Sequence, residues 1–153
     1  MDASTLLTRQ GQRLLQVGML LLLYSCVEGF VIPILASPRI GLSVHTLSAY
    51  QGVLLMTQGL LWHRLKLGTG ASSVAFWCAI LGALAILAAY SVAAAWGVGN
   101  ETIKLAGELP HGLAHGSPLP ETFIKVLAYS SAPPGLVWIA LVLWGLRAET
   151  GQR

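Results

Sequence analysis

Charged residues are scarce in this sequence. Only 10% of its 153 residues are Asp, Glu, Lys or Arg, whereas a soluble domain has roughly 25%. Hydrophobic residues make up 55% of the chain, and the mean hydropathy is +0.70. A soluble domain of this size buries only about two-thirds of the surface that its unfolded chain exposes, so it could not hide this much apolar surface. We therefore expect an integral membrane protein, with residues 1–153 forming a single membrane domain.

Other features are absent as well. The only cysteines, Cys26 and Cys78, fall inside apolar runs, which excludes a secreted disulfide scaffold. No Walker, Rossmann or Cys-x-x-Cys motif occurs, so we expect no soluble catalytic domain. The net charge of +3 is small and dispersed, so we expect no nucleic-acid partner. The remaining partners are membrane lipid, other membrane helices and small apolar or amphipathic molecules.

Long apolar segments occur four times. A spanning helix needs about 20 mostly apolar residues, and the segments that satisfy this are residues 14–35, 42–62, 74–98 and 122–146. We therefore predict an all-α fold, a bundle of four transmembrane helices, in which the second is the least hydrophobic. The pair Pro133 and Pro134 predicts a kink near the middle of the fourth span.

Basic residues are distributed unevenly between the two ends of this bundle. One end has Arg9, Arg13, Arg64, Lys66, Arg147 and Arg153, and the other has Arg39, Lys104 and Lys125. Because Lys and Arg are in excess on the cytoplasmic side of membrane proteins, both termini are predicted to be cytoplasmic. The long loop at 99–121 would then lie outside, and a bacterial inner membrane fits a compact protein of this kind.

Several polar side chains fall in the outer halves of the predicted spans. Glu28 is the only carboxylate deep within a span, with Tyr24 one turn before it, and Tyr90 and Tyr129 lie at a similar depth. Ionisable groups in a bilayer are costly and usually functional. A structural hydrogen bond between helices is the alternative role for Glu28.

His45 lies near the outer end of the second span. Ser48, Ala49 and Gly52 follow it at i+3, i+4 and i+7, so small side chains share its helix face. Such a strip would let a flat macrocycle lie against the helix while the histidine ligates its metal. Small residues equally permit two helices to pack closely, so spacing alone leaves both interpretations open.

Two weaker patterns complete the list of candidates. His111 and His115 are four residues apart and could bind a metal if the loop were helical. The surrounding glycines and prolines argue against a helix there. The spacing of Gly52 and Gly59 is given little weight.

Residues 36–62, ASPRIGLSVHTLSAYQGVLLMTQGLLW, resemble a segment of the hydroxylaminobenzene mutases, which are small four-helix membrane proteins. The resemblance rests on SPRIGL at 37–42, on His45 and on the Gln51–Gly52 pair, and the closing LVLWGLR also looks like the end of that family. A histidine with an amide six residues later is similar to a segment of the styrene oxide isomerases, which are trimeric membrane isomerases. At the level of hydropathy the resemblance extends over residues 10–147.

The resemblance implies a cofactor and a set of site residues. It implies ferric haem b as a Lewis acid, with His45 as the axial ligand and with Ser48, Ala49 and Gly52 beside the macrocycle. Gln51 stands where the family has a substrate-orienting Asn, and Tyr90 would face the substrate. Glu28 would act as a supporting or proton-relay group. A homotrimer with haem at the subunit interface is the expected assembly.

The expected function is an isomerase of aromatic degradation that converts an aryl hydroxylamine, such as hydroxylaminobenzene, to 2-aminophenol. Isomerisation of an aryl epoxide, styrene oxide to phenylacetaldehyde, is the alternative on the same scaffold. Two departures bear on the substrate: Leu47 stands where the mutases often have Glu, and Gln51 replaces Asn. The extra methylene of Gln51 moves its amide by about 1 Å, which can alter rate or substrate. A non-catalytic membrane subunit is the second alternative, and it would tolerate His45→Ala.

Overall fold

The computed structural model describes residues 3–99, 102–103 and 118–147. Within these residues all regular secondary structure is helical, which confirms the predicted all-α fold. The helices are α1 (Ala3–Val31), α2 (Pro38–Leu61), α3 (Thr69–Trp96), α4 (Pro118–Ser130) and α5 (Ala132–Gly145). Short 3₁₀ turns, η1 (Ile32–Ile34) and η2 (Trp62–Arg64), follow α1 and α2. Helix α1 begins well before the predicted residue 14.

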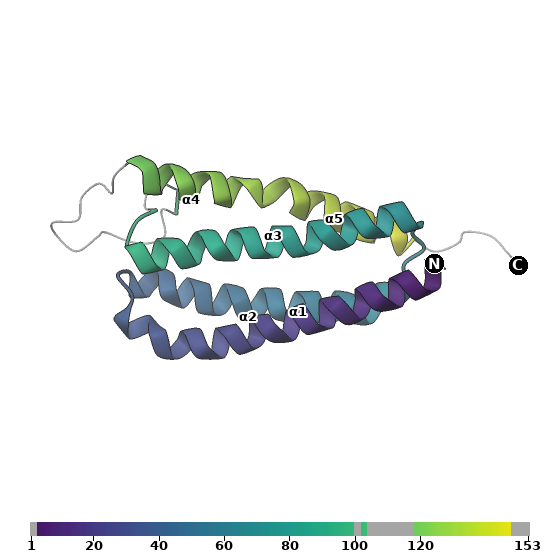
Figure 1. Ribbon diagram of the computed structural model, residues 1–153, viewed down its shortest axis with the longest axis horizontal. Coiled ribbons are helices and arrows are strands. Elements are labelled where there is room, and N and C mark those ends of the chain that lie inside the picture. Colours follow the sequence, from purple (N-terminus) through teal and green to yellow (C-terminus); the bar gives the residue numbers. More distant parts are fainter. Residues whose placement is uncertain (1–2, 100–101, 104–117, 148–153) are drawn as a thin grey trace, which may run out of the picture.

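The helices lie roughly side by side along the long axis of the bundle. Helices α1 and α2 form an antiparallel hairpin, α3 packs against it, and α4 and α5 follow one another along the far side of α3 (Figure 1). The first turn of α1 and the last turn of α5 lie at the same end. Two backbone hydrogen bonds join the connections to neighbouring helices: Lys66 N–H donates to Gly145 O at 2.9 Å, and Ser37 N–H donates to Ala94 O at 3.0 Å.

Three helical segments are long and apolar enough to cross a membrane. They are Ser4–Ile34, Thr69–Trp96 and Leu119–Gly145, which correspond to the first, third and fourth predicted spans. Helix α2 forms where the second span was predicted, but it is not among these three.

The last of these segments is interrupted at Ser131, between α4 and α5. Pro133 and Pro134 follow this residue, and proline removes an N–H donor and clashes with the carbonyl four residues earlier. The hydroxyl of Ser131 donates to Ala128 O at 2.6 Å, and that of Ser130 donates to Leu127 O at 2.8 Å. The helix is therefore broken where the kink was predicted.

Hydrogen bonds also connect three elements at the basic end of the bundle. Trp62 is fully buried, and its Nε1 donates to Gln10 Oε1 of α1 at 3.0 Å. The same amide donates from Nε2 to Ser73 Oγ of α3 at 3.4 Å. Trp62 is thus a core residue.

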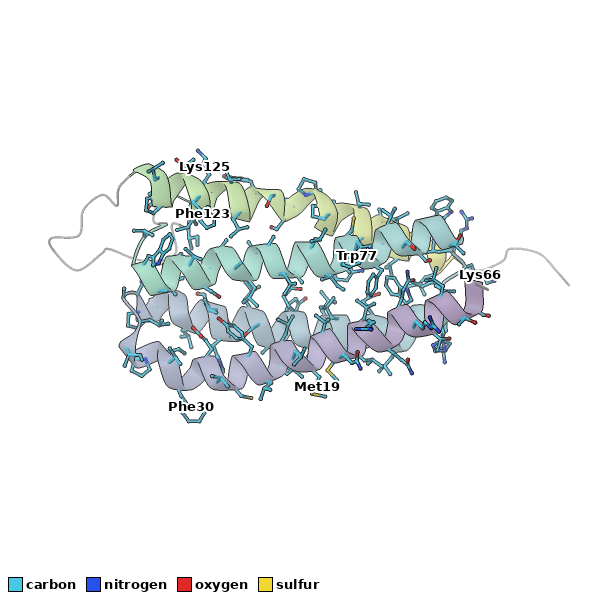
Figure 2. The ribbon with its side chains drawn as sticks, viewed as in Figure 1. Met19, Phe30, Lys66, Trp77, Phe123 and Lys125 are labelled. Carbon is cyan, nitrogen blue, oxygen red and sulfur yellow. The ribbon has the colours of Figure 1, made fainter. Side chains whose placement is uncertain are left out.

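Large apolar side chains cover the outside of the bundle. Figure 2 shows Met19 and Phe30 pointing away from the other helices on the free side of α1, and Phe30 is 87% exposed. Exposed apolar surface of this extent marks contact with lipid or with another protein.

Candidate functional site

The two helices of the α1–α2 hairpin touch at their backbones. Gly11 and Gly18 of α1 face Gly59 and Gly52 of α2, and we call these four residues the glycine ladder. A Cβ added to Gly18 would lie 2.6 Å from the carbonyl oxygen of Gly52, and one added to Gly11 would lie 2.8 Å from that of Gly59. Because seven residues make nearly two helical turns, a repeat of seven keeps these contacts on one line. A side chain as small as a methyl group would force the helices apart.

The next step of the same repeat places Ser25 opposite His45. The Ser25 hydroxyl donates to the His45 carbonyl oxygen at 2.8 Å. The His45 Nδ1 atom lies 2.8 Å from the Ser25 carbonyl oxygen and 3.2 Å from Ser25 Oγ. A carbonyl oxygen can only accept, so Nδ1 carries a proton, and in the neutral ring Nε2 keeps its lone pair.

The imidazole ring lies partly exposed against α1. Gly29 faces it, and a Cβ built there would lie 3.4 Å from Nδ1 and 3.5 Å from Cε1. The ring is therefore fixed between two helices with one free basic nitrogen, which is the form in which histidine binds a metal.

The small residues that follow His45 do not share one environment. Ser48 is fully buried, and its hydroxyl donates to the His45 carbonyl oxygen at 3.0 Å. A Cβ at Gly52 would lie 2.8 Å from Gly18 O, so this position faces α1, whereas Ala49 is partly exposed. In the single chain Ser48 and Gly52 serve helix packing. Contact of these three residues with a cofactor stays a prediction.

A second polar cluster joins α1 to α3 near the same end. Glu28 is buried, and Tyr24 lies one turn earlier on the same helix. The Tyr24 hydroxyl lies 3.0 Å from Ser91 Oγ, which itself donates to Leu87 O at 2.9 Å. Glu28 therefore has the neighbouring tyrosine expected from their spacing, and the cluster also supplies a contact between helices.

Gln51 lies apart from His45. It follows His45 by six residues, which places it about 120° around α2. Its Oε1 atom is buried without a hydrogen-bond partner, and Tyr90 packs partly buried against the core. One chain therefore does not present His45 and Gln51 on the same helix face.

Other candidates are not joined to these clusters. Tyr129 is 65% exposed on α4. His111 and His115 lie outside the described residues. Among the residues that are described, no group of three or more His, Cys, Asp and Glu side chains could hold a metal ion. A single axial histidine needs no such group.

The glycine ladder is the part of the site that the sequence interpretation missed. Its signal is a pair of glycines seven residues apart in α1, Gly11 and Gly18, and a second pair with the same spacing in α2, Gly52 and Gly59. Two such pairs in adjacent antiparallel helices predict backbone contact along a line that ends at His45.

Comparisons with known proteins extend over nearly the whole chain. The family model for styrene oxide isomerase matches residues 10–147. The chain is 38% identical over 142 residues to hydroxylaminobenzene mutase HabB of Ectopseudomonas oleovorans, which covers 93% of this chain and 84% of that protein. It is 30% identical over 129 residues to hydroxylaminobenzene mutase HabA of the same organism, covering 84% of this chain and 93% of that protein. No solved structure shows significant similarity.

Proposed function

Because the chain belongs to the styrene oxide isomerase family and is an isomerase, we propose that it rearranges an aryl hydroxylamine, such as hydroxylaminobenzene, to the 2-aminophenol. The observation that carries this proposal is the 38% identity to a hydroxylaminobenzene mutase over 93% of the chain. Isomerisation of an aryl epoxide is the second candidate, because the matching family model is described as styrene oxide isomerase.

We propose that α2 crosses the membrane together with α1, which gives four spans. The glycine ladder holds the two helices together at backbone distance. At 1.5 Å per residue the 24 residues of α2 span about 36 Å, more than the hydrocarbon core of about 30 Å. The hydroxyls of Thr46 and Thr57 donate to Leu42 O and Val53 O within α2. Because these hydrogen bonds satisfy both hydroxyls, the two threonines add little to the cost of placing α2 in a bilayer.

The same proposal places both termini in the cytoplasm of a bacterium and the protein in its inner membrane. The end of the bundle that contains the first turns of α1 has Arg9, Arg13, Arg64 and Lys66. The excess of basic residues supports this orientation.

The proposed cofactor is ferric haem b with His45 as its axial ligand. The hydrogen bond from Nδ1 leaves Nε2 as the free donor atom, and the ring is partly exposed on the hairpin. When bound, ferric haem b supplies a Lewis acid that weakens an N–O or C–O bond without net electron transfer. The donor chemistry of His45 fits this group.

Three polar residues are proposed to act on the substrate. The unpartnered Oε1 of Gln51 can accept a hydrogen bond from an N–H or O–H group of the substrate. The Tyr90 hydroxyl can donate or accept a proton near the reacting atoms. Glu28, with Tyr24 beside it, can store or relay a proton within the bundle.

We propose a homotrimer in which two copies complete each site. His45 and Gln51 lie about 120° apart on α2, so one copy does not present both to a small aromatic molecule. In a cyclic oligomer the His45 face of one copy meets a different face of the next copy. The exposed apolar side chains on the bundle supply surface for such contact.

Mixed oligomers test this arrangement. A protein with His45→Ala and one with Gln51→Ala should each be inactive alone. Co-expressed in equal amounts, random cyclic trimers should recover about one quarter of wild-type activity, because a site needs its two intact residues from adjacent copies. No recovery in demonstrably mixed trimers would refute site sharing.

The cofactor and the reaction are tested on the purified protein. We expect a haem absorption band that is lost in His45→Ala and kept in His63→Ala, a matched control because His63 is exposed at the other end of α2. Hydroxylaminobenzene and styrene oxide are then assayed in parallel. Protein made with ample haem that shows no such band would overturn the cofactor, and turnover of the epoxide alone would overturn the proposed substrate.

A further inference from the structure

Ser25 contacts His45 with both its hydroxyl and its carbonyl group. The hydroxyl proton is donated to the His45 carbonyl oxygen at 2.8 Å. Since that proton is used, Ser25 Oγ can only accept from Nδ1, which lies 3.2 Å away. The Ser25 carbonyl oxygen accepts from the same Nδ1 at 2.8 Å. Ser25 is 3% exposed, so water does not compete for these bonds.

This use of a serine hydroxyl differs from the usual pattern in the bundle. The hydroxyls of Thr46, Thr57 and Ser91 each donate to the carbonyl four residues earlier in their own helix. Such bonds satisfy a polar group inside an apolar helix without involving a neighbour. Ser25 instead donates across to α2, and it does so at the position where the repeat of Gly11 and Gly18 continues.

We propose that Ser25 is a positioning residue that fixes the tautomer and the orientation of the His45 ring, and so directs Nε2 toward the cofactor. The inference rests on the proposed function, in which His45 is the axial ligand. A partner of the second ring nitrogen orients a metal-ligating histidine and raises its basicity, and loss of such a partner typically costs about 10- to 100-fold in metal affinity.

The expected loss lies at the lower end of that range. In Ser25→Ala the backbone carbonyl remains and can still accept from Nδ1, so only the hydroxyl contacts disappear. We therefore expect haem affinity to fall about tenfold. Ser25→Gly removes the same hydroxyl and extends the glycine repeat by one step, so it tests the effect in a background that keeps close packing.

Ser72 provides the matched control. It is a buried serine like Ser25, but its hydroxyl donates within its own helix α3, to Thr69 O at 3.1 Å. Ser72→Ala therefore removes a buried serine hydroxyl and leaves the imidazole contacts of His45 in place. Haem affinity in this variant should stay within about twofold of the wild type, well short of the loss expected when a ring partner is removed.

The experiment has two measurements on the full-length protein in detergent. Haem titration, followed by absorbance, gives the affinity of the wild type, Ser25→Ala, Ser25→Gly and Ser72→Ala. Nitrogen-15 NMR of the haem-free protein reports which nitrogen of His45 carries the proton, with His45→Ala used for assignment. We expect protonated Nδ1, weaker haem binding in both Ser25 variants and unchanged haem binding in Ser72→Ala.

The outcomes separate this inference from the proposed function. If the wild type binds haem and the Ser25 variants bind it equally well, Ser25 is not a positioning residue, although the cofactor stands. A proton on Nε2 in the haem-free wild type would also overturn the inference. If the wild type binds no haem, the proposed cofactor fails, and the role of Ser25 toward it fails for that separate reason.

Discussion

The substitution Gly18→Ala tests whether the glycine ladder positions His45. The added Cβ would lie 2.6 Å from Gly52 O, whereas carbon and carbonyl oxygen normally approach to about 3.3–3.6 Å. The helices must therefore separate locally by about 0.7–1 Å. Overpacking of this kind costs about 1–3 kcal/mol, and the better helix propensity of alanine offsets roughly 1 kcal/mol of it.

Gly135→Ala is the matched control, because a Cβ at Gly135 has no atom within 4 Å. Both variants gain the same helix propensity, so the difference between their free energies of unfolding isolates the packing cost of about 1–3 kcal/mol. Ser25 lies seven residues beyond Gly18, about 10 Å along α1. Separation of the two helices at Gly18 would therefore also stretch the 2.8 Å hydrogen bond from His45 to Ser25. Gly18→Ala should therefore bind haem more weakly than Gly135→Ala. Stability is measured by thermal unfolding and haem affinity by titration. If Gly18→Ala and Gly135→Ala were equal in both, the reasoning would be refuted.

Three further predictions concern the polar clusters. Trp62→Phe should destabilise the protein by about 1–3 kcal/mol in thermal unfolding, because the buried Gln10 oxygen loses its donor; an unchanged melting temperature would contradict this. Tyr24→Phe should cost about 1 kcal/mol by the loss of one partly buried hydrogen bond, whereas Tyr129→Phe on the exposed face should cost nothing measurable, and equal effects would disprove the distinction. Gln51→Asn should shift the ratio of kcat/KM for hydroxylaminobenzene and styrene oxide by about tenfold or more, because it moves the amide by about 1 Å, and should leave haem content unchanged; an unaltered ratio would exclude Gln51 from substrate selection.

Hydropathy was sufficient to locate the helices but not their ends. Helix α1 starts at Ala3 and not at residue 14, because Arg9 and Arg13 are compatible with a helix that extends beyond the apolar core. The break at Ser131 followed from Pro133 and Pro134, since proline acts through local geometry that the sequence records directly. The position of this break was therefore predictable from the two prolines alone.

The environment of His45 was not predictable in the same way. Its neighbours Ser48 and Gly52 are close in sequence and suggested a surface for a macrocycle, yet both are covered within the chain. The residue that binds the imidazole, Ser25, is on another helix and has no distinctive local pattern. Only the pairing of α1 with α2 in a particular register brings the two together.

The register of α1 against α2 pairs residues of the two helices at intervals of seven. Gly11 faces Gly59, Gly18 faces Gly52, and at the third interval Ser25 faces His45. The two glycine steps hold the backbones so close that the third step can form hydrogen bonds from side chain to backbone in both directions. The segment of α2 that resembles the mutases is thus only half of the histidine site. Transferred alone onto another helical hairpin, it should supply an imidazole without a fixed tautomer, whereas transfer with Gly11, Gly18 and Ser25 of α1 should restore the protonated Nδ1. Nitrogen-15 NMR of the two hairpins would decide between a motif carried by one helix and a site built by two.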